Sequence, residues 1–156
     1  MDTLIIFGAK YLIVLSILVA MSVVWIVPQK DRVRFTMLLV LSLPIAYILA
    51  KIGGHLYMND RPFVVGHFTP LVEHGVDNGF PSDHTLLASA LAAVVTVIRP
   101  RIGAILWIFA IVIGVCRVLA GVHHAIDIIG AMVIAVVAVY ATYKLLHIRL
   151  PRALRD

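Results

Sequence analysis

The stretch NGFPSDHTLLASALAAVV, residues 78–95, joins a polar turn to an apolar helix. Its first seven residues are mostly polar, carry Gly and Pro, and end in an Asp–His pair, whereas the remainder is almost wholly apolar. Pro81 suits the first turn of a helix, and Ser82 or Asp83 suits an N-cap. The stretch therefore predicts a membrane helix that begins directly after a group of chemically active side chains.

The composition indicates an integral membrane protein. Hydrophobic residues make up 62% of the 156 residues and charged residues only 13%, whereas a soluble domain is about a quarter charged. So few charges cannot cover a water-facing surface. The length fits a single domain, residues 1–156, with about five spans of roughly 20 residues each.

Five apolar stretches predict an all-α fold, a polytopic membrane helix bundle with about five transmembrane helices. A span needs about 20 mainly apolar residues, and the third stretch reaches this length only with the polar turn before it. The stretches lie at residues 4–27, 35–57, 85–98, 102–118 and 125–146.

The positive charges predict how the bundle is oriented. Nine of the 13 Lys and Arg residues lie in the loops at 28–34 and 99–103 and in the tail after residue 143. Positive charges favour the cytoplasmic side, which puts the N-terminus outside and the C-terminus in the cytoplasm. Because the net charge of +5 is explained by orientation, we expect no nucleic-acid partner. The loop at 58–84 and the turn at 117–124 then face the extracytoplasmic side, and a hairpin of the last two spans brings them together.

The segment CRVLAGVHHAID, residues 116–127, contains a candidate nucleophile. His123 and Asp127 are four residues apart, so they share one face if a helix begins there. A carboxylate on one imidazole nitrogen fixes the tautomer and leaves the other nitrogen free to attack. His124 has no carboxylate four residues on, so we favour His123. The alternative is a polar pair that stabilises helix packing.

Two further clusters supply anion-binding groups and a proton donor. The helix that begins near Ser82 offers free N–H groups to an anion, and His84 could protonate a leaving oxygen. Arg61 can form a bidentate pair with a phosphate, and Lys51 could snorkel to the same level. Taken singly, these features also fit a capped helix with a surface histidine and a membrane-interface anchor. Together they predict a phosphate-ester site in which one histidine attacks phosphorus and the other protonates the leaving group.

The three clusters, in this order, resemble the type 2 phosphatidic acid phosphatase superfamily of membrane lipid phosphatases. That family carries K-x6-R-P, then P-S-G-H, then S-R-x5-H-x3-D, and the resemblance covers about residues 51–127. It implies a mechanism through a phosphohistidine that needs neither a metal nor another cofactor. By position it implies catalytic roles for His123 as nucleophile, Asp127 as its orienting acid and His84 as general acid, and a phosphate-binding group of Arg61, Arg117, Ser82, Lys51 and Asp83.

The sequence departs from the family pattern at four points. Lys51 precedes Arg61 by ten residues rather than seven, which moves it by about 300° around an ideal helix. Asp83 replaces the usual Gly and adds a negative charge, which should weaken anion binding unless a cation pairs with it. Cys116 replaces the usual Ser, and five predicted spans replace six.

The FPSDH form is similar to the bacitracin-resistance branch of the family, the undecaprenyl-diphosphate phosphatases of bacterial cell-wall recycling. The resemblance implies that the chain hydrolyses undecaprenyl diphosphate at the extracytoplasmic face of the bacterial plasma membrane. Three alternatives remain: a phosphatase for another lipid, such as phosphatidylglycerol phosphate or phosphatidic acid; a lipid phosphotransferase; and a transporter.

The loop also holds a group of histidines and carboxylates. Their spacing is not the compact spacing of a metal site, so we expect no metal. They are His55, His67, Glu73, His74 and Asp77.

Overall fold

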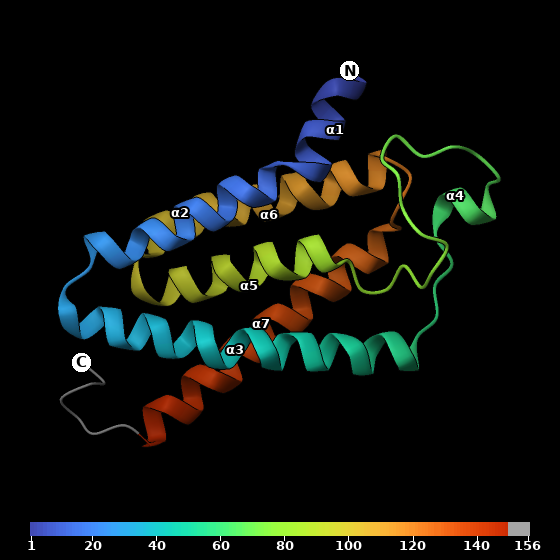
Figure 1. Ribbon diagram of the computed structural model, residues 1–156. Helices are drawn as coiled ribbons and strands as arrows, with labels where there is room; N and C mark the ends of the chain where they lie inside the picture. Colours follow the sequence, from blue (N-terminus) through green and yellow to red (C-terminus); the bar gives the residue numbers. More distant parts are fainter. Residues whose placement is uncertain (150–156) are drawn as a thin grey trace.

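The computed structural model describes residues 1–149, which fold into helices and connecting loops (Figure 1). The all-α prediction is confirmed. The helices are α1 (Asp2–Lys10), α2 (Leu12–Ile26), α3 (Gln29–Leu56), α4 (Pro62–Val65), α5 (Asp83–Ile98), α6 (Pro100–Leu119) and α7 (Ala125–Arg149).

Three of these helices, α3, α6 and α7, are long and apolar enough to cross a membrane. The predicted first span is broken at Tyr11 into α1 and α2, which are bent by 43° and count as a fourth span if taken together. Helix α5 has 16 residues and is about 24 Å long, which is less than the roughly 30 Å of a hydrocarbon core. By length alone the described residues therefore give three or four spans rather than the predicted five.

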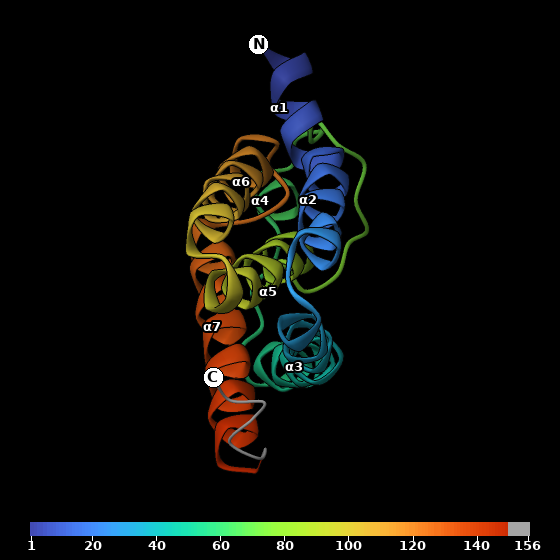
Figure 2. The same ribbon diagram turned by 90° about the vertical axis from the view of Figure 1, so that its left-hand side faces the viewer.

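Helix α5 lies at the centre of the bundle. In both views α2 and α6 lie on one side of it and α3 on the other, and α7 crosses the bundle at an angle (Figures 1 and 2). In α5, Ala88, Ala90 and Ala92 are fully buried. Their small side chains let the neighbouring helices approach closely. The segment that opens with the PSDH turn is thus the core element of the fold, and its first turn is held by the surrounding helices.

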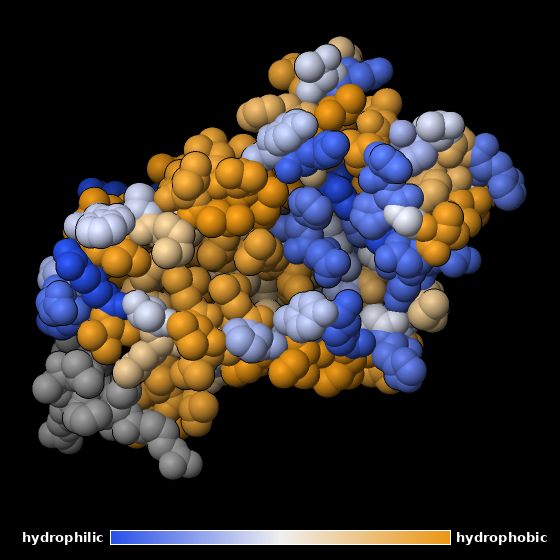
Figure 3. All heavy atoms as spheres, in the orientation of Figure 1, coloured by the Kyte–Doolittle hydropathy of each residue, from blue (hydrophilic) through white to orange (hydrophobic). Residues whose placement is uncertain are grey.

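The outer surface separates into an apolar belt and two polar ends. Large apolar side chains are exposed along the helices, among them Trp25, Ile108 and Val137. Figure 3 shows hydrophobic residues over the sides of the bundle and hydrophilic residues gathered at the loop end and at the α2–α3 end. An exposed apolar surface of this extent fits a lipid environment. The chain is therefore a multi-pass membrane protein.

The long loop between α3 and α5 packs on the α6–α7 turn. Backbone N–H groups of Phe63 and Leu71 donate to the carbonyls of Gly121 (3.2 Å) and Ala120 (3.0 Å). Gly121 has a φ of +79°, and the Phe68 ring occupies the space that a Cβ would need there, so this position requires glycine. Helices α6 and α7 meet at this turn but diverge from it and pack on α5 rather than on each other, so the last two spans do not form the predicted hairpin pair (Figure 1). The turn nevertheless meets the loop, which brings the three sequence clusters to one end of the bundle.

Candidate active site

His123 lies in the turn between α6 and α7 and is only 2% exposed. Its Nδ1 is 2.9 Å from the carbonyl oxygen of Gly79 and 3.4 Å from Oδ2 of Asp127. Because a carbonyl oxygen can only accept a hydrogen bond, Nδ1 must carry the proton and donate it. The lone pair of the neutral ring is therefore on Nε2, the nitrogen that a nucleophilic imidazole uses.

Asp127 is fully buried and held from two sides. Its Oδ1 accepts a hydrogen bond from Nδ2 of Asn59 (2.6 Å), and its Oδ2 accepts one from the backbone N–H of His124 (2.8 Å). The predicted four-residue pairing with His123 is present. The ring of His124 points elsewhere, with Nε2 3.2 Å from the carbonyl oxygen of Asp60. The geometry therefore places His123, and not His124, at the centre of the site.

Two buried guanidinium groups converge on the lone pair of His123. Nη1 of Arg61 and Nη2 of Arg117 each lie 3.3 Å from Nε2. Arg61 is fixed by the carbonyl oxygen of Val122 (2.9 Å) and the Asp77 carboxylate (2.8 Å). Nε of Arg117, in contrast, is buried without a hydrogen-bond partner among the described residues. Two buried like charges with an unused donor form a site that an anion would complete.

The charge state of His123 fits a nucleophile. Burial lowers the pKa of the His123 imidazole, and the hydrogen bond to Asp127 opposes this shift; the positive charges of Arg117 and Arg61 lower the pKa further. The ring is therefore neutral at neutral pH, and its Nε2 keeps the lone pair. The sequence alone predicted the Asp127 partner, but the two guanidinium groups on Nε2 appear only in the folded chain.

The start of α5 contributes a second set of groups. Ser82 is the fully buried N-cap residue, and its side chain makes no capping bond. Its backbone N–H donates to the carbonyl of Asp127 (3.2 Å), which ties α5 to α7. The N–H groups of the first turn remain available to an anion. His84, half-buried in this turn, lies within electrostatic range of Arg117 and His123.

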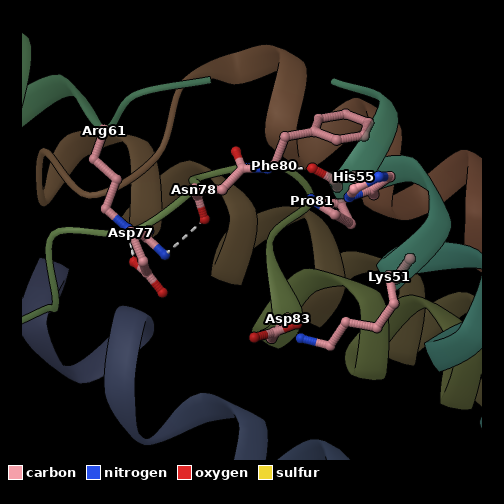
Figure 4. Close-up of a pocket in the computed structure, with 10 residues that line it drawn as sticks. Lys51, His55, Arg61, Asp77, Asn78, Phe80, Pro81 and Asp83 are labelled. Carbon is pink, nitrogen blue, oxygen red and sulfur yellow. Dashed lines mark hydrogen bonds and ion pairs between the residues drawn. The ribbon is translucent and has the colours of Figure 1, made fainter. Parts of the chain in front are cut away.

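A polar pocket of about 340 Å³ opens beside Arg61. Figure 4 shows Arg61 with its contacts to Asp77 and Asn78 on one side and Lys51 on the other, its ammonium pointing toward the Asp83 carboxylate. Both Lys51 and Asp83 are exposed, and the ammonium lies 5.1 Å from the centre of the Tyr47 ring. The structure thus brings five of the seven other predicted site residues around His123 and its partner Asp127, and it places Lys51 and Asp83 at the pocket.

Several groups that hold the site were not predicted. The carbonyl of Gly79 fixes the His123 tautomer, and Asn59 holds Asp127. Asn78 donates to the carbonyl of Gly54 (2.7 Å) and accepts from the backbone N–H of Phe80 (3.0 Å), which shapes the turn before α5. Asn before Gly is a turn signal, whereas a backbone carbonyl leaves no signal in the side-chain pattern.

The structure also shows where Cys116 and the candidate metal ligands lie. A Cβ at Gly8 of α1 would overlap Sγ of Cys116, so the cysteine packs α6 against α1. Within residues 1–149, no three His, Cys, Asp or Glu side chains come together in an arrangement that could hold a metal ion.

The fold and the site define a helical membrane protein with a buried histidine at a two-arginine anion site. Comparison with known sequences shows that the chain belongs to the PAP2 superfamily, which it matches over residues 35–150. This confirms the family resemblance of the three motifs.

Two curated relatives carry different names. The chain is 29% identical to the bacitracin transport permease protein BcrC of Bacillus licheniformis over 85% of its own length and 65% of that protein, so it spans less than two thirds of that relative. It is 26% identical to the undecaprenyl-diphosphatase BcrC of Bacillus subtilis, over 92% of this chain and 74% of the relative. Among solved structures, Aquifex aeolicus LpxE superimposes with a TM-score of 0.69 at 24% identity, over 91% of this chain and 82% of that one, which supports the fold.

Proposed function

We propose that this chain is a lipid phosphatase that hydrolyses undecaprenyl diphosphate to undecaprenyl phosphate and inorganic phosphate. The observation that carries the proposal is the free Nε2 of a buried histidine between two guanidinium groups, 3.3 Å from each. An attacking nitrogen and donors for the phosphoryl oxygens are thus in place before substrate binds. The name of the Bacillus subtilis relative supports the choice of substrate.

The first step is attack by His123 on the terminal phosphorus. A bond forms between Nε2 and phosphorus while the bond from phosphorus to the bridging oxygen breaks, and the electron pair goes to that oxygen. His84, whose protonated form the negative charge of the bound diphosphate favours, donates the proton that the leaving undecaprenyl phosphate takes up. Arg61 and Arg117 turn their N–H groups from Nε2 to the phosphoryl oxygens, whose charge they stabilise.

The second step is hydrolysis of the phosphohistidine. Water attacks phosphorus, the bond to Nε2 breaks, and its electron pair returns to His123, so that inorganic phosphate leaves. The positive charge that His123 carries while phosphorylated is compensated by the buried carboxylate of Asp127. No metal enters either step.

A groove next to the polar pocket suits a lipid chain. It has a volume of about 220 Å³, lies between α3 and α5, and meets the pocket at Asp83. Apart from Asp83 its lining is apolar or aromatic, with Leu43, Tyr47 and Leu87 among the residues. A substrate with its phosphates in the pocket can lay its hydrocarbon chain here. The distribution of Lys and Arg supports a site on the extracytoplasmic face.

Three alternatives are separated by experiment. Nothing in the groove distinguishes a polyprenyl chain from acyl chains, so phosphatidylglycerol phosphate and phosphatidic acid are competing substrates. A phosphotransferase would pass the phosphoryl group to a second lipid instead of water. Transport, which the name of the Bacillus licheniformis relative suggests for that protein, would not require His123 as a nucleophile.

The test is phosphate release from undecaprenyl diphosphate in detergent with EDTA present. We expect release by the wild type and loss of release by His123→Ala. His124→Ala is the matched control, because this neighbouring ring points away from the site and the backbone N–H to Asp127 is kept. Equal phosphate release by wild type and His123→Ala would exclude His123 as the nucleophile. Faster phosphate release from another phospholipid would make that lipid the substrate. A phosphorylated second lipid among the products would identify a phosphotransferase.

A further inference from the structure

The loop before α5 carries a second histidine–carboxylate pair, to which the mechanism above gives no role. The ring of His74 lies 5.9 Å from that of His123, centre to centre, at an interplanar angle of 79°. Its side chain is 24% exposed. The charges of Arg61 and Arg117 both act on it, and these are the two groups that approach Nε2 of His123. His74 therefore lies beside His123 and within electrostatic range of both arginines.

The carboxylate of Asp77 lies beside the His74 ring. Nδ1 of His74 is buried without a hydrogen bond and lies 3.8 Å from Oδ1 of Asp77. The same Oδ1 accepts a hydrogen bond from Nε of Arg61 at 2.8 Å. Asp77 thus links the His74 ring to a guanidinium group of the site, and His123 likewise has a carboxylate near its Nδ1.

The surroundings favour the neutral form of His74. Burial is the main cause that lowers its pKa, and the positive charges of Arg61 and Arg117 lower it further, as does His123. Two other titrating groups face it: the Asp77 carboxylate from its own loop, and the imidazole of His84 from α5. A neutral imidazole has one unprotonated ring nitrogen, which can take up a proton from water.

We propose that His74 is the general base of the second step, which rests on the proposed function. Water donates a proton to the unprotonated ring nitrogen of His74 as its oxygen bonds to phosphorus; the bond to His123 breaks, and the electron pair returns to Nε2 of His123. A water ready to attack lies about 3–3.5 Å from phosphorus. A ring in edge contact with His123 is close enough to serve a water at that position. His84 then serves the leaving group in the first step, and His74 serves the water in the second.

The experiment separates the two steps with substrate labelled at the terminal phosphate. Reactions of the wild type and of His74→Gln are stopped in alkali, in which phosphohistidine is stable, and labelled protein and released phosphate are counted over time. In His74→Gln we expect labelled protein to form at the wild-type rate and to accumulate, while turnover falls about 10²-fold or more, the usual contribution of a general base. His67→Asn is the matched loop control, because Asn tolerates the φ of +50° at this position.

A second variant distinguishes a base from a residue that only supports Arg61. Added imidazole should restore turnover of His74→Ala and shorten the life of its labelled protein, because the free base can enter the space left. Slow labelling of His74→Gln would overturn the proposal, and so would unchanged turnover of this variant. It would also be overturned if labelled His74→Gln did not accumulate and imidazole did not restore turnover of His74→Ala. If the wild type itself releases no phosphate, the proposed function fails, and this result is distinct from all of these.

Discussion

Asp127→Asn tests whether Gly79 or Asp127 holds the tautomer of His123. When a carboxylate alone fixes the catalytic tautomer, replacing it by an amide costs about 10⁴-fold in kcat. Here the shorter contact of Nδ1 is to the Gly79 carbonyl, 2.9 Å against 3.4 Å to Asp127. The tautomer should therefore survive the substitution.

The size of the effect follows from the lost contacts. A hydrogen bond to a charged group contributes about 1.5–3 kcal/mol, and the 3.4 Å bond belongs at the lower end, so we expect kcat to fall by roughly tenfold. The amide oxygen can serve only one of the two donors that the carboxylate now satisfies, Asn59 and the N–H of His124. One buried donor without a partner costs about 1–3 kcal/mol, so the melting temperature in detergent should also fall.

The pH profile gives a second, independent readout. Burial lowers the pKa of His123, and the hydrogen bond to Asp127 partly opposes this. Without the carboxylate the pKa falls further. Because the nucleophile must be unprotonated, activity is lost as the pH falls through this pKa, and the acidic limb of Asp127→Asn should lie at lower pH than that of the wild type. A 10⁴-fold loss of kcat with an unchanged melting temperature, or an acidic limb displaced upward, would refute the reasoning.

Three further substitutions test other parts of the site. Arg117→Ala should lower kcat/KM about 10- to 150-fold through the loss of charge-assisted bonds to the phosphoryl group, whereas Arg117→Lys should keep part of the wild-type kcat/KM. Initial rates over a range of substrate concentrations measure kcat/KM, and equal losses in the two variants would mean that the shape of the guanidinium group is decisive. Lys51→Ala should raise KM only a few-fold because its ammonium is exposed and directed at Asp83, and a large fall in kcat would place it on the phosphate instead. Gly130→Leu should destabilise the protein by about 1–3 kcal/mol, because a side chain there overlaps the Phe80 ring in the turn before α5; thermal unfolding in detergent measures this, and an unchanged melting temperature would show that the turn can move at no cost.

The sequence predicts the helices well because their apolar stretches are long and are separated by segments that contain Pro, Gly or charged residues. It predicts the contact between His123 and Asp127 from their four-residue spacing, although α7 begins only at Ala125 and His123 lies in the turn before it. It does not reveal the break at Tyr11, because no Pro lies in the apolar run and its Gly8 lies inside α1. It also could not reveal that Gly79 holds the His123 ring, since that contact is made by a backbone carbonyl whose position depends on the whole loop.

Two departures from the family pattern, at Lys51 and Asp83, concern one place in the structure. The extra negative charge of Asp83 would oppose an anion at the start of α5 unless a cation faced it. The shift of the lysine to ten residues before Arg61 provides such a cation, since Lys51 points across the pocket toward Asp83 (Figure 4). The two changes therefore belong together. The cations at Nε2 of His123 are the two arginines, and the lysine and the aspartate face each other where the polar pocket meets the apolar groove.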